Sequence, residues 1–314
     1  MLNKLFLPVG MPLALLMAFT APSAGGFIKN SIGNNALIVF IFLLCGWEAR
    51  LADFHFDKRT ALAFLFGAAL ALILSPWLAL WLLRMLRLSG MATTGLVVIS
   101  AVPPTISSGV VMTRNAAGNA ILAMTVTLGY NILGVISMPL MLAWCLAGNG
   151  SFDIQPLAMF LNLLLLIILP FVAGLLVRRI ARHELPKCLN QLPSLCIVLL
   201  LLSFFSGSGQ MLRSSPLSLI LLSGLAGLVL HSLLLSLIWF GGAALGFSVA
   251  DRKALLFTAG SKTISITLAT LAIMKTLDGQ AAVPCMVFYF VQMMMDSCLA
   301  GKLGANAQPD LKKA

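Results

Sequence analysis

Long apolar runs follow one another along this 314-residue chain and are separated by short polar segments. A bilayer core about 30 Å thick is crossed by a helix of about 20 apolar residues, and lipid offers no hydrogen-bond partners to open strands. Strands of a membrane barrel would instead alternate in hydropathy over about ten residues. Only 9% of the residues are charged, whereas soluble domains have about 25%. The sequence therefore predicts an all-α integral membrane protein.

Hydropathy and loop residues predict ten spans. They cover residues 4–24, 31–51, 60–86, 91–115, 119–147, 154–180, 189–211, 215–246, 251–275 and 279–303. The first run also resembles a signal peptide, because Lys4 precedes it and small residues begin at Ala21. We favour a retained first helix.

The basic residues indicate the orientation of these spans. With a cytoplasmic N-terminus, 14 of the 20 Lys and Arg residues lie in inside segments and five in outside segments. Positive residues accumulate on the cytoplasmic side, so we expect both termini inside, in a bacterial inner membrane. The net charge of +11 is thus a topology signal, and no nucleic-acid partner is expected. The remaining basic residue, Lys262, falls in the middle of the ninth span.

The fourth span contains a helix break. Pro103 and Pro104 lack the N–H groups that the carbonyls of Ile99 and Ser100 would need, and a polar segment continues to Asn119. Such backbone occurs at membrane depth only where protein or a water-filled cavity receives it, and in transporters it often marks the binding site. A proline kink packed against a neighbouring helix is the alternative.

Two short matches relate the halves of the chain. Thr105-Ile-Ser recurs as Thr263-Ile-Ser, and Gly118-Asn-Ala finds Gly279-Gln-Ala at nearly the same offset. Repeats of five spans have opposite orientations in the membrane. We therefore expect residues 1–153 and 154–314 to form two inverted repeats, whose broken fourth and ninth helices cross at mid-membrane.

The crossing would favour an anion. Helix restarts after Pro104 and Gly260 would direct two helix N-termini, each with about half a positive charge, into one cavity, and Lys262 adds a full charge. No cofactor or metal cluster is expected, and Na+ or H+ would be the coupling ion. The candidate substrate- or ion-binding residues are Thr105, Ser107, Ser108, Thr113, Asn115, Asn119, Ser261, Lys262, Thr263, Ser265 and Gln292.

Lys262 has an alternative partner inside the membrane. Among the acidic residues only Asp296 lies well inside a span, at a depth that a lysine reaches. A pair between them could be structural, or it could be broken by substrate or a proton during coupling. His231 in the eighth span could relay protons, or it could be a buried residue with its hydrogen bonds satisfied. We treat Asp296 and His231 as coupling candidates.

Three segments resemble one family. They are SAVPPTISSGVVMTRNAAGN at 100–119, LFTAGSKT at 256–263 and LCGWEARL at 44–51, the last without the histidine of the family motif. Together with ten spans and broken fourth and ninth helices, they make the whole chain similar to the SBF-like branch of the bile acid:sodium symporter superfamily. The resemblance implies a sodium-coupled secondary transporter of organic anions.

The chain departs from that family at the implied sodium ligands. The resemblance places an acid and a glutamine in the ninth helix where this chain has Thr258 and Lys262, and a Ser-Asn pair in the fourth where it has Gly109 and Val110. A carboxylate is a strong ligand for a hard cation, and an ammonium repels a second cation. We therefore expect weak sodium dependence and coupling to protons.

The leading interpretation is a secondary active transporter, working by alternating access, for a bile-acid-like anion or a small carboxylate or sulfate. The alternatives are a sodium-coupled symporter and, from another class, a non-transporting membrane sensor or accessory subunit. An enzyme is not expected. The sequence contains no nucleophile with a base, no metal cluster and no pair of deep carboxylates.

Overall fold

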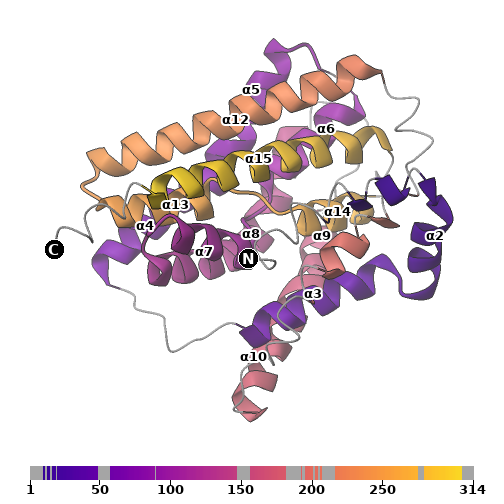
Figure 1. Ribbon diagram of the computed structural model, residues 1–314, viewed down its shortest axis with the longest axis horizontal. Helices are drawn as coiled ribbons and strands as arrows, with labels where there is room; N and C mark the ends of the chain where they lie inside the picture. The colour runs from indigo at the N-terminus through magenta and orange to yellow at the C-terminus, as the bar shows by residue number, and fades with distance from the viewer. Residues whose placement is uncertain are drawn as a thin grey trace.

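The computed structural model describes residues 20–48, 57–88, 90–146, 156–181, 216–274 and 279–305, with a few residues between 10 and 18 and between 192 and 206. Within these ranges every element is a helix and no strand occurs, which confirms the all-α class. In Figure 1, α12 and α15 lie side by side along one side of the bundle, and α3 and α10 pack together at the other.

The helices lie within or close to the predicted spans from α4 onward. Their bounds are α2 (Pro22–Ser31), α3 (Asn34–Glu48), α4 (Lys58–Ala68), η2 (Ala69–Leu74), α5 (Ser75–Met85), α6 (Met91–Ala101), α7 (Ile106–Asn115), α8 (Ala120–Leu146), α9 (Pro156–Leu163), η4 (Leu164–Ile168), α10 (Leu169–Ala181), α12 (Leu217–Ala244), α13 (Val249–Ala259), α14 (Ile264–Ile273) and α15 (Gly279–Ala305).

Six helices in the described residues are long and apolar enough to cross a membrane, and the bent pair of α2 and α3 would make a seventh. The ten predicted spans are therefore reproduced only in part, because the first and seventh fall largely outside the described residues. The inverted repeat and the two halves, 1–153 and 154–314, stay predictions.

The N-terminal region differs from expectation. Residues 25–30 were expected to be a loop, but they belong to α2, which is bent by 73° against α3. Pro22 suits the first turn of α2 because N–H groups there have no helical partner, and Gly33 ends it with a φ of +80°. Proline and glycine here mark the two ends of a helix rather than a loop between two spans.

The third span, Lys58–Met85, is continuous but contains the wide turns of η2. Its last wide turn is closed by the N–H of Ser75, which donates to the carbonyl of Leu70. The next such donor would be residue 76, which is a proline and has no N–H. The carbonyl of Ala71 is therefore left without a partner from its own helix.

Small residues let α3 and α10 approach closely. A Cβ added to Gly46 would lie 2.0 Å from the carbonyl oxygen of Phe171, and one added to Gly174 would lie 2.0 Å from that of Leu43. Glycine at such contacts allows the backbones of membrane helices to touch. This pair forms one side of the bundle, and the two broken spans lie in the rest.

Candidate functional site

Both predicted helix breaks are present. Residues 102–105 interrupt the fourth span between α6 and α7, and residues 260–263 interrupt the ninth between α13 and α14. Helix α7 packs against α13, and α6 packs against α14. The two interrupted spans therefore contact each other on both sides of their breaks.

The side chain of Lys262, in the ninth-span break, donates hydrogen bonds to backbone carbonyls of the third span and of the fourth-span break. This side chain is fully buried, and Nζ donates to the carbonyl of Ala71 and, at 3.4 Å, to that of Val102. The carbonyl of Ala71 lacks a helical donor because of Pro76, and Val102 is the extended residue at which α6 ends before Pro103 and Pro104. An ammonium offers three donors and no acceptor, so Lys262 satisfies carbonyls that lipid could not.

Gln292 of α15 holds the backbone of Lys262 from the other side. Its Oε1 accepts from the Lys262 N–H at 2.9 Å, and its Nε2 donates to the Lys262 carbonyl at 3.0 Å. Gln292 and the break are both buried. Helix α15 therefore holds the non-helical backbone of the ninth-span break by two hydrogen bonds from one side chain.

Asp296, one turn further along α15, does not pair with Lys262. Its Oδ1 lies 3.0 Å from Nε2 of His231 on α12, and its Oδ2 accepts from the Ser261 hydroxyl at 2.8 Å. The three side chains are at most 4% exposed, and Nδ1 of His231 has no partner among the described residues. The two coupling candidates thus come together with Ser261, whereas the lysine that was expected to pair with Asp296 lies against carbonyls.

The hydroxyls at the fourth-span break contact each other. Thr105 is the N-cap residue of α7, but its side chain bonds to the hydroxyl of Ser108 instead of capping the helix. Asn131 of α8 donates to the carbonyl of Pro104 at 3.0 Å, and its Oδ1 has no partner among the described residues. From the sequence, Asn131 could either line a path beside the break or form an interhelical hydrogen bond, and in the structure it forms such a bond to the break.

Other candidates lie near the breaks but make local bonds. The hydroxyls of Thr263 and Ser265 are 3.3 Å apart, and that of Thr113 donates to the carbonyl of Gly109 in its own helix. Ser107 lies in the first turn of α7, and the structure does not describe its side chain. Gly260 ends α13 as predicted.

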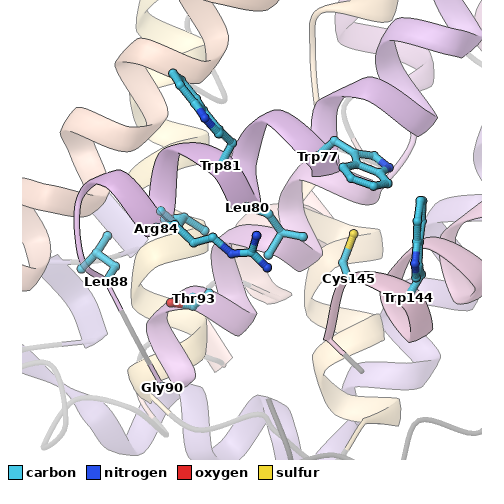
Figure 2. A pocket seen from close by; sticks show the side chains of 10 residues that line it. Trp77, Leu80, Trp81, Arg84, Leu88, Gly90, Thr93, Trp144 and Cys145 are labelled. Atoms are coloured by element: carbon cyan, nitrogen blue, oxygen red, sulfur yellow. The ribbon is translucent and has the colours of Figure 1, made fainter. Parts of the chain in front are cut away.

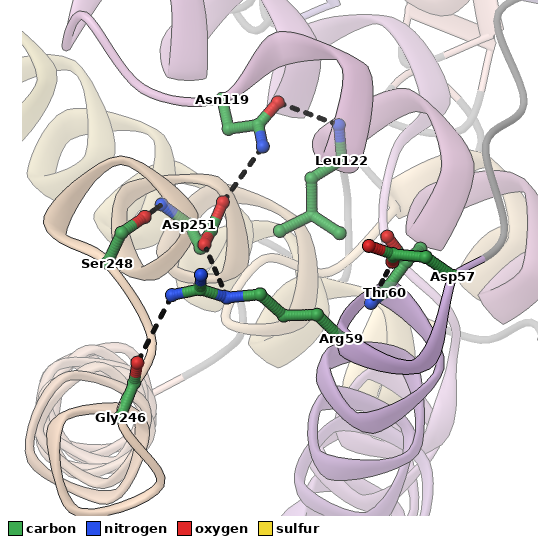
Figure 3. Close-up of polar contacts among 8 residues, drawn as sticks. All are labelled: Asp57, Arg59, Thr60, Asn119, Leu122, Gly246, Ser248 and Asp251. Carbon is green, nitrogen blue, oxygen red and sulfur yellow. Dashed lines mark hydrogen bonds and ion pairs between the residues drawn. The ribbon is translucent and has the colours of Figure 1, made fainter.

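Asn115 ends α7, about 15 Å from the break at 1.5 Å per residue, and Asn119 follows it in the turn before α8. Asn119 donates to Asp251 at 2.8 Å and caps α8 through the N–H of Leu122 (Figure 3). Arg59 lies 3.5 Å from the same aspartate. These residues join the ends of helices, away from Lys262.

Lys253 strengthens the same end of the bundle. Only 7% exposed, it donates to the carbonyl of Ala116 at 2.7 Å and to that of Leu303 at 3.3 Å. Ala116 is the C-cap residue of α7, and Leu303 lies in the last turn of α15. A buried lysine thus fastens α13 to both.

A cavity of about 480 Å³ opens at the opposite end of the Lys58–Met85 span. Figure 2 shows the guanidinium of Arg84 near Leu80, with Trp77 and Trp144 beside them. The rings of Trp77 and Trp144 meet edge to face at 4.2 Å. None of the predicted site residues lines this cavity; tryptophans next to an arginine at a span end were its only sequence signal.

Comparison with known proteins gives one consistent result. The model of the SBF-like CPA transporter family matches residues 5–305. The chain is 24% identical over 313 residues to the probable sodium/metabolite cotransporter BASS4, chloroplastic, of Arabidopsis thaliana, covering 94% of this chain and 71% of that protein. It is 25% identical over 316 residues to the sodium/bile acid cotransporter 7 of Mus musculus, covering 95% and 92%.

Proposed function

Because the chain belongs to the SBF-like CPA transporter family, we propose that it moves an organic anion across a bacterial inner membrane by alternating access around the two breaks. The chain is an integral membrane protein and a secondary transporter, not an enzyme. The substrate class we favour is a bile-acid-like anion or a small carboxylate or sulfate. The bias of basic residues supports cytoplasmic termini.

The buried ammonium of Lys262 carries this proposal. It lies between the two breaks, and the first turn of α7 beside it has no side-chain cap. Free N–H groups at a helix N-terminus and a positive charge together favour a carboxylate or sulfate. The anion would replace the carbonyls of Ala71 and Val102 as the partner of Nζ. The hydroxyls of Thr105, Ser108, Ser261, Thr263 and Ser265 would be further donors.

Coupling to protons is our preferred mode. Lys262 and Thr258 stand where the family resemblance implies cation ligands, and an ammonium there opposes a second cation. Sodium symport is the second candidate, since the relatives are named as sodium cotransporters. Steep stimulation of uptake by an inward sodium gradient at constant pH would favour that second candidate.

Uptake into proteoliposomes tests the proposal. The substrates would be labelled bile acids, short keto acids, pantoate-like acids and steroid sulfates, each with and without sodium. We expect saturable uptake of at least one class, and its loss in Lys262→Ala. Lys302→Ala, at an exposed position near the end of α15, is the control.

Normal uptake of every transported anion by Lys262→Ala would refute the role of this residue. Thermal stabilisation by an anion without any uptake would instead favour a sensor.

A further inference from the structure

We propose that His231, Asp296 and Ser261 form the proton-binding site of this transporter, and that one proton enters with each singly charged anion. This inference rests on the proposed function, because it names the coupling ion and its site. It is carried by the geometry of the three buried side chains between α12, the ninth-span break and α15.

The hydrogen bonds define where a proton can go. One oxygen of Asp296 accepts from the Ser261 hydroxyl at 2.8 Å, and the other lies 3.0 Å from His231 Nε2. In the proposed resting state Asp296 is a carboxylate that accepts both bonds, and His231 carries its hydrogen on Nε2. Nδ1 is then a buried lone pair with no partner in the described part of the chain. A hydronium ion transfers its proton to that lone pair and leaves as water, and return of the proton to water on the other side of the membrane restores the neutral ring.

The charges at the break explain why an anion would accompany the proton. Ser261, which bonds Asp296, is followed directly by Lys262, so a negative and a positive group belong to one break. With a neutral His231 these charges cancel. Protonation of His231 leaves one positive charge in a site closed to solvent, and an uncompensated buried charge is costly. A singly charged anion at Lys262 removes this cost, which links the two binding events.

The same bonds connect the proton to the anion site. An imidazolium draws the Asp296 carboxylate more strongly than a neutral ring does and so weakens its hold on Ser261. Gln292, one turn away on α15, holds the neighbouring backbone of Lys262. A change at Asp296 therefore acts directly on the segment that positions the ammonium.

Other ionisable groups around His231 are few. The helices packed against α12 are α5, α6, η2, α13 and α15. In the described part of the chain, α15 has the ionisable side chains Cys285, Tyr289, Asp296, Cys298 and Lys302. The start of α13 has Asp251, Arg252 and Lys253, the end of α5 has Arg84, and the adjoining break has Lys262. Among these, Asp296 is the group that bonds His231.

The proton site can be tested without transport. Histidine labelled with 15N in full-length protein reconstituted in liposomes would be followed by NMR between pH 5 and 8. The chain has three histidines, so His231→Gln identifies the signal. We expect an Nε2–H tautomer at high pH and an imidazolium at low pH. In Asp296→Asn the imidazolium signal should weaken, because its counter-charge is gone. A His231 signal that is unchanged across this range would overturn the site.

The coupling is tested in the same liposomes with taurocholate, whose sulfonate stays ionised throughout this range. We expect an inward proton gradient to drive accumulation, and a potassium diffusion potential to leave it unchanged. Asp296→Asn should lose at least about tenfold of gradient-driven accumulation and still exchange internal for external taurocholate, because the charge of Lys262 alone then matches that of the anion. His231→Gln, in which this charge stays cancelled, should lose both. Ser236→Ala, an exposed serine on α12, is the matched control.

The two proposals fail in different ways. Taurocholate uptake that ignores the proton gradient, or that responds to it equally in His231→Gln, would overturn the coupling while leaving transport in place. Absence of uptake for every anion, with His231 still titrating, would refute the proposed function and not the proton site. Loss of exchange together with accumulation in both variants would show that the cluster is structural and would overturn the inference.

Discussion

Replacing Gln292 by methionine removes the two bonds by which α15 holds the backbone of Lys262, at 2.9 and 3.0 Å, and keeps the length of the side chain. Interhelical hydrogen bonds in membrane proteins contribute about 0.6 kcal/mol on average and up to about 1.7. Two of them give about 1.2 to 3.4 kcal/mol. The buried N–H and carbonyl left without partners move the expected loss toward the upper value.

The free energy of unfolding would be measured by reversible titration with dodecyl sulfate in mixed micelles, followed by tryptophan fluorescence. Met294→Leu, at an exposed position on the same helix, is the control. A loss below about 0.3 kcal/mol for Gln292→Met would refute the two-bond argument. The kinetics separate two roles: a substrate ligand, as the sequence predicted for Gln292, raises KM at unchanged stability, whereas a holder of the break lowers stability and transport together.

Four further substitutions test the packing of the bundle. Lys253→Met should lower the free energy of unfolding by at least about 1.5 kcal/mol, because two buried carbonyls lose a charged donor; a neutral result by the same titration would contradict this. Arg59→Gln should lower the free energy of unfolding by less than about 1 kcal/mol, since the arginine side chain is 56% exposed. Asp251→Asn should lower it more, because Asp251 also accepts a part-buried hydrogen bond from the side-chain amide of Asn119. Gly174→Ala should cost about 1 to 3 kcal/mol in melting experiments, unlike Gly26→Ala, whose added methyl meets nothing within 4 Å.

The two breaks illustrate what was predictable. Proline lacks an N–H and lipid offers no replacement, so Pro103 and Pro104 had to interrupt a helix wherever that helix lay. Lys262 stood out for a similar reason, as a basic residue that no loop could hold. Both arguments depend on local chemistry and on depth, which follows from counting residues along a helix.

The partner of Lys262 was not predictable in this way. Depth alone placed Asp296 within its reach, but the direction of a side chain around its helix depends on how the helices pack. In the structure Asp296 contacts α12 and Ser261, and the wide turn before Pro76 gives the ammonium a carbonyl on a third helix. That wide turn has no mark in the sequence except the proline.

The sequence by itself determined that this chain is a bundle of membrane helices interrupted at two polar segments, because hydropathy and missing donors act residue by residue. Only the tertiary structure decided which buried groups meet. Residues 30 to 191 positions apart make these contacts: Lys262 to the carbonyl of Ala71, Gln292 to the backbone of Lys262, and Asp296 to His231 and Ser261. Such contacts depend on the rotation and crossing of whole helices, which no local pattern encodes.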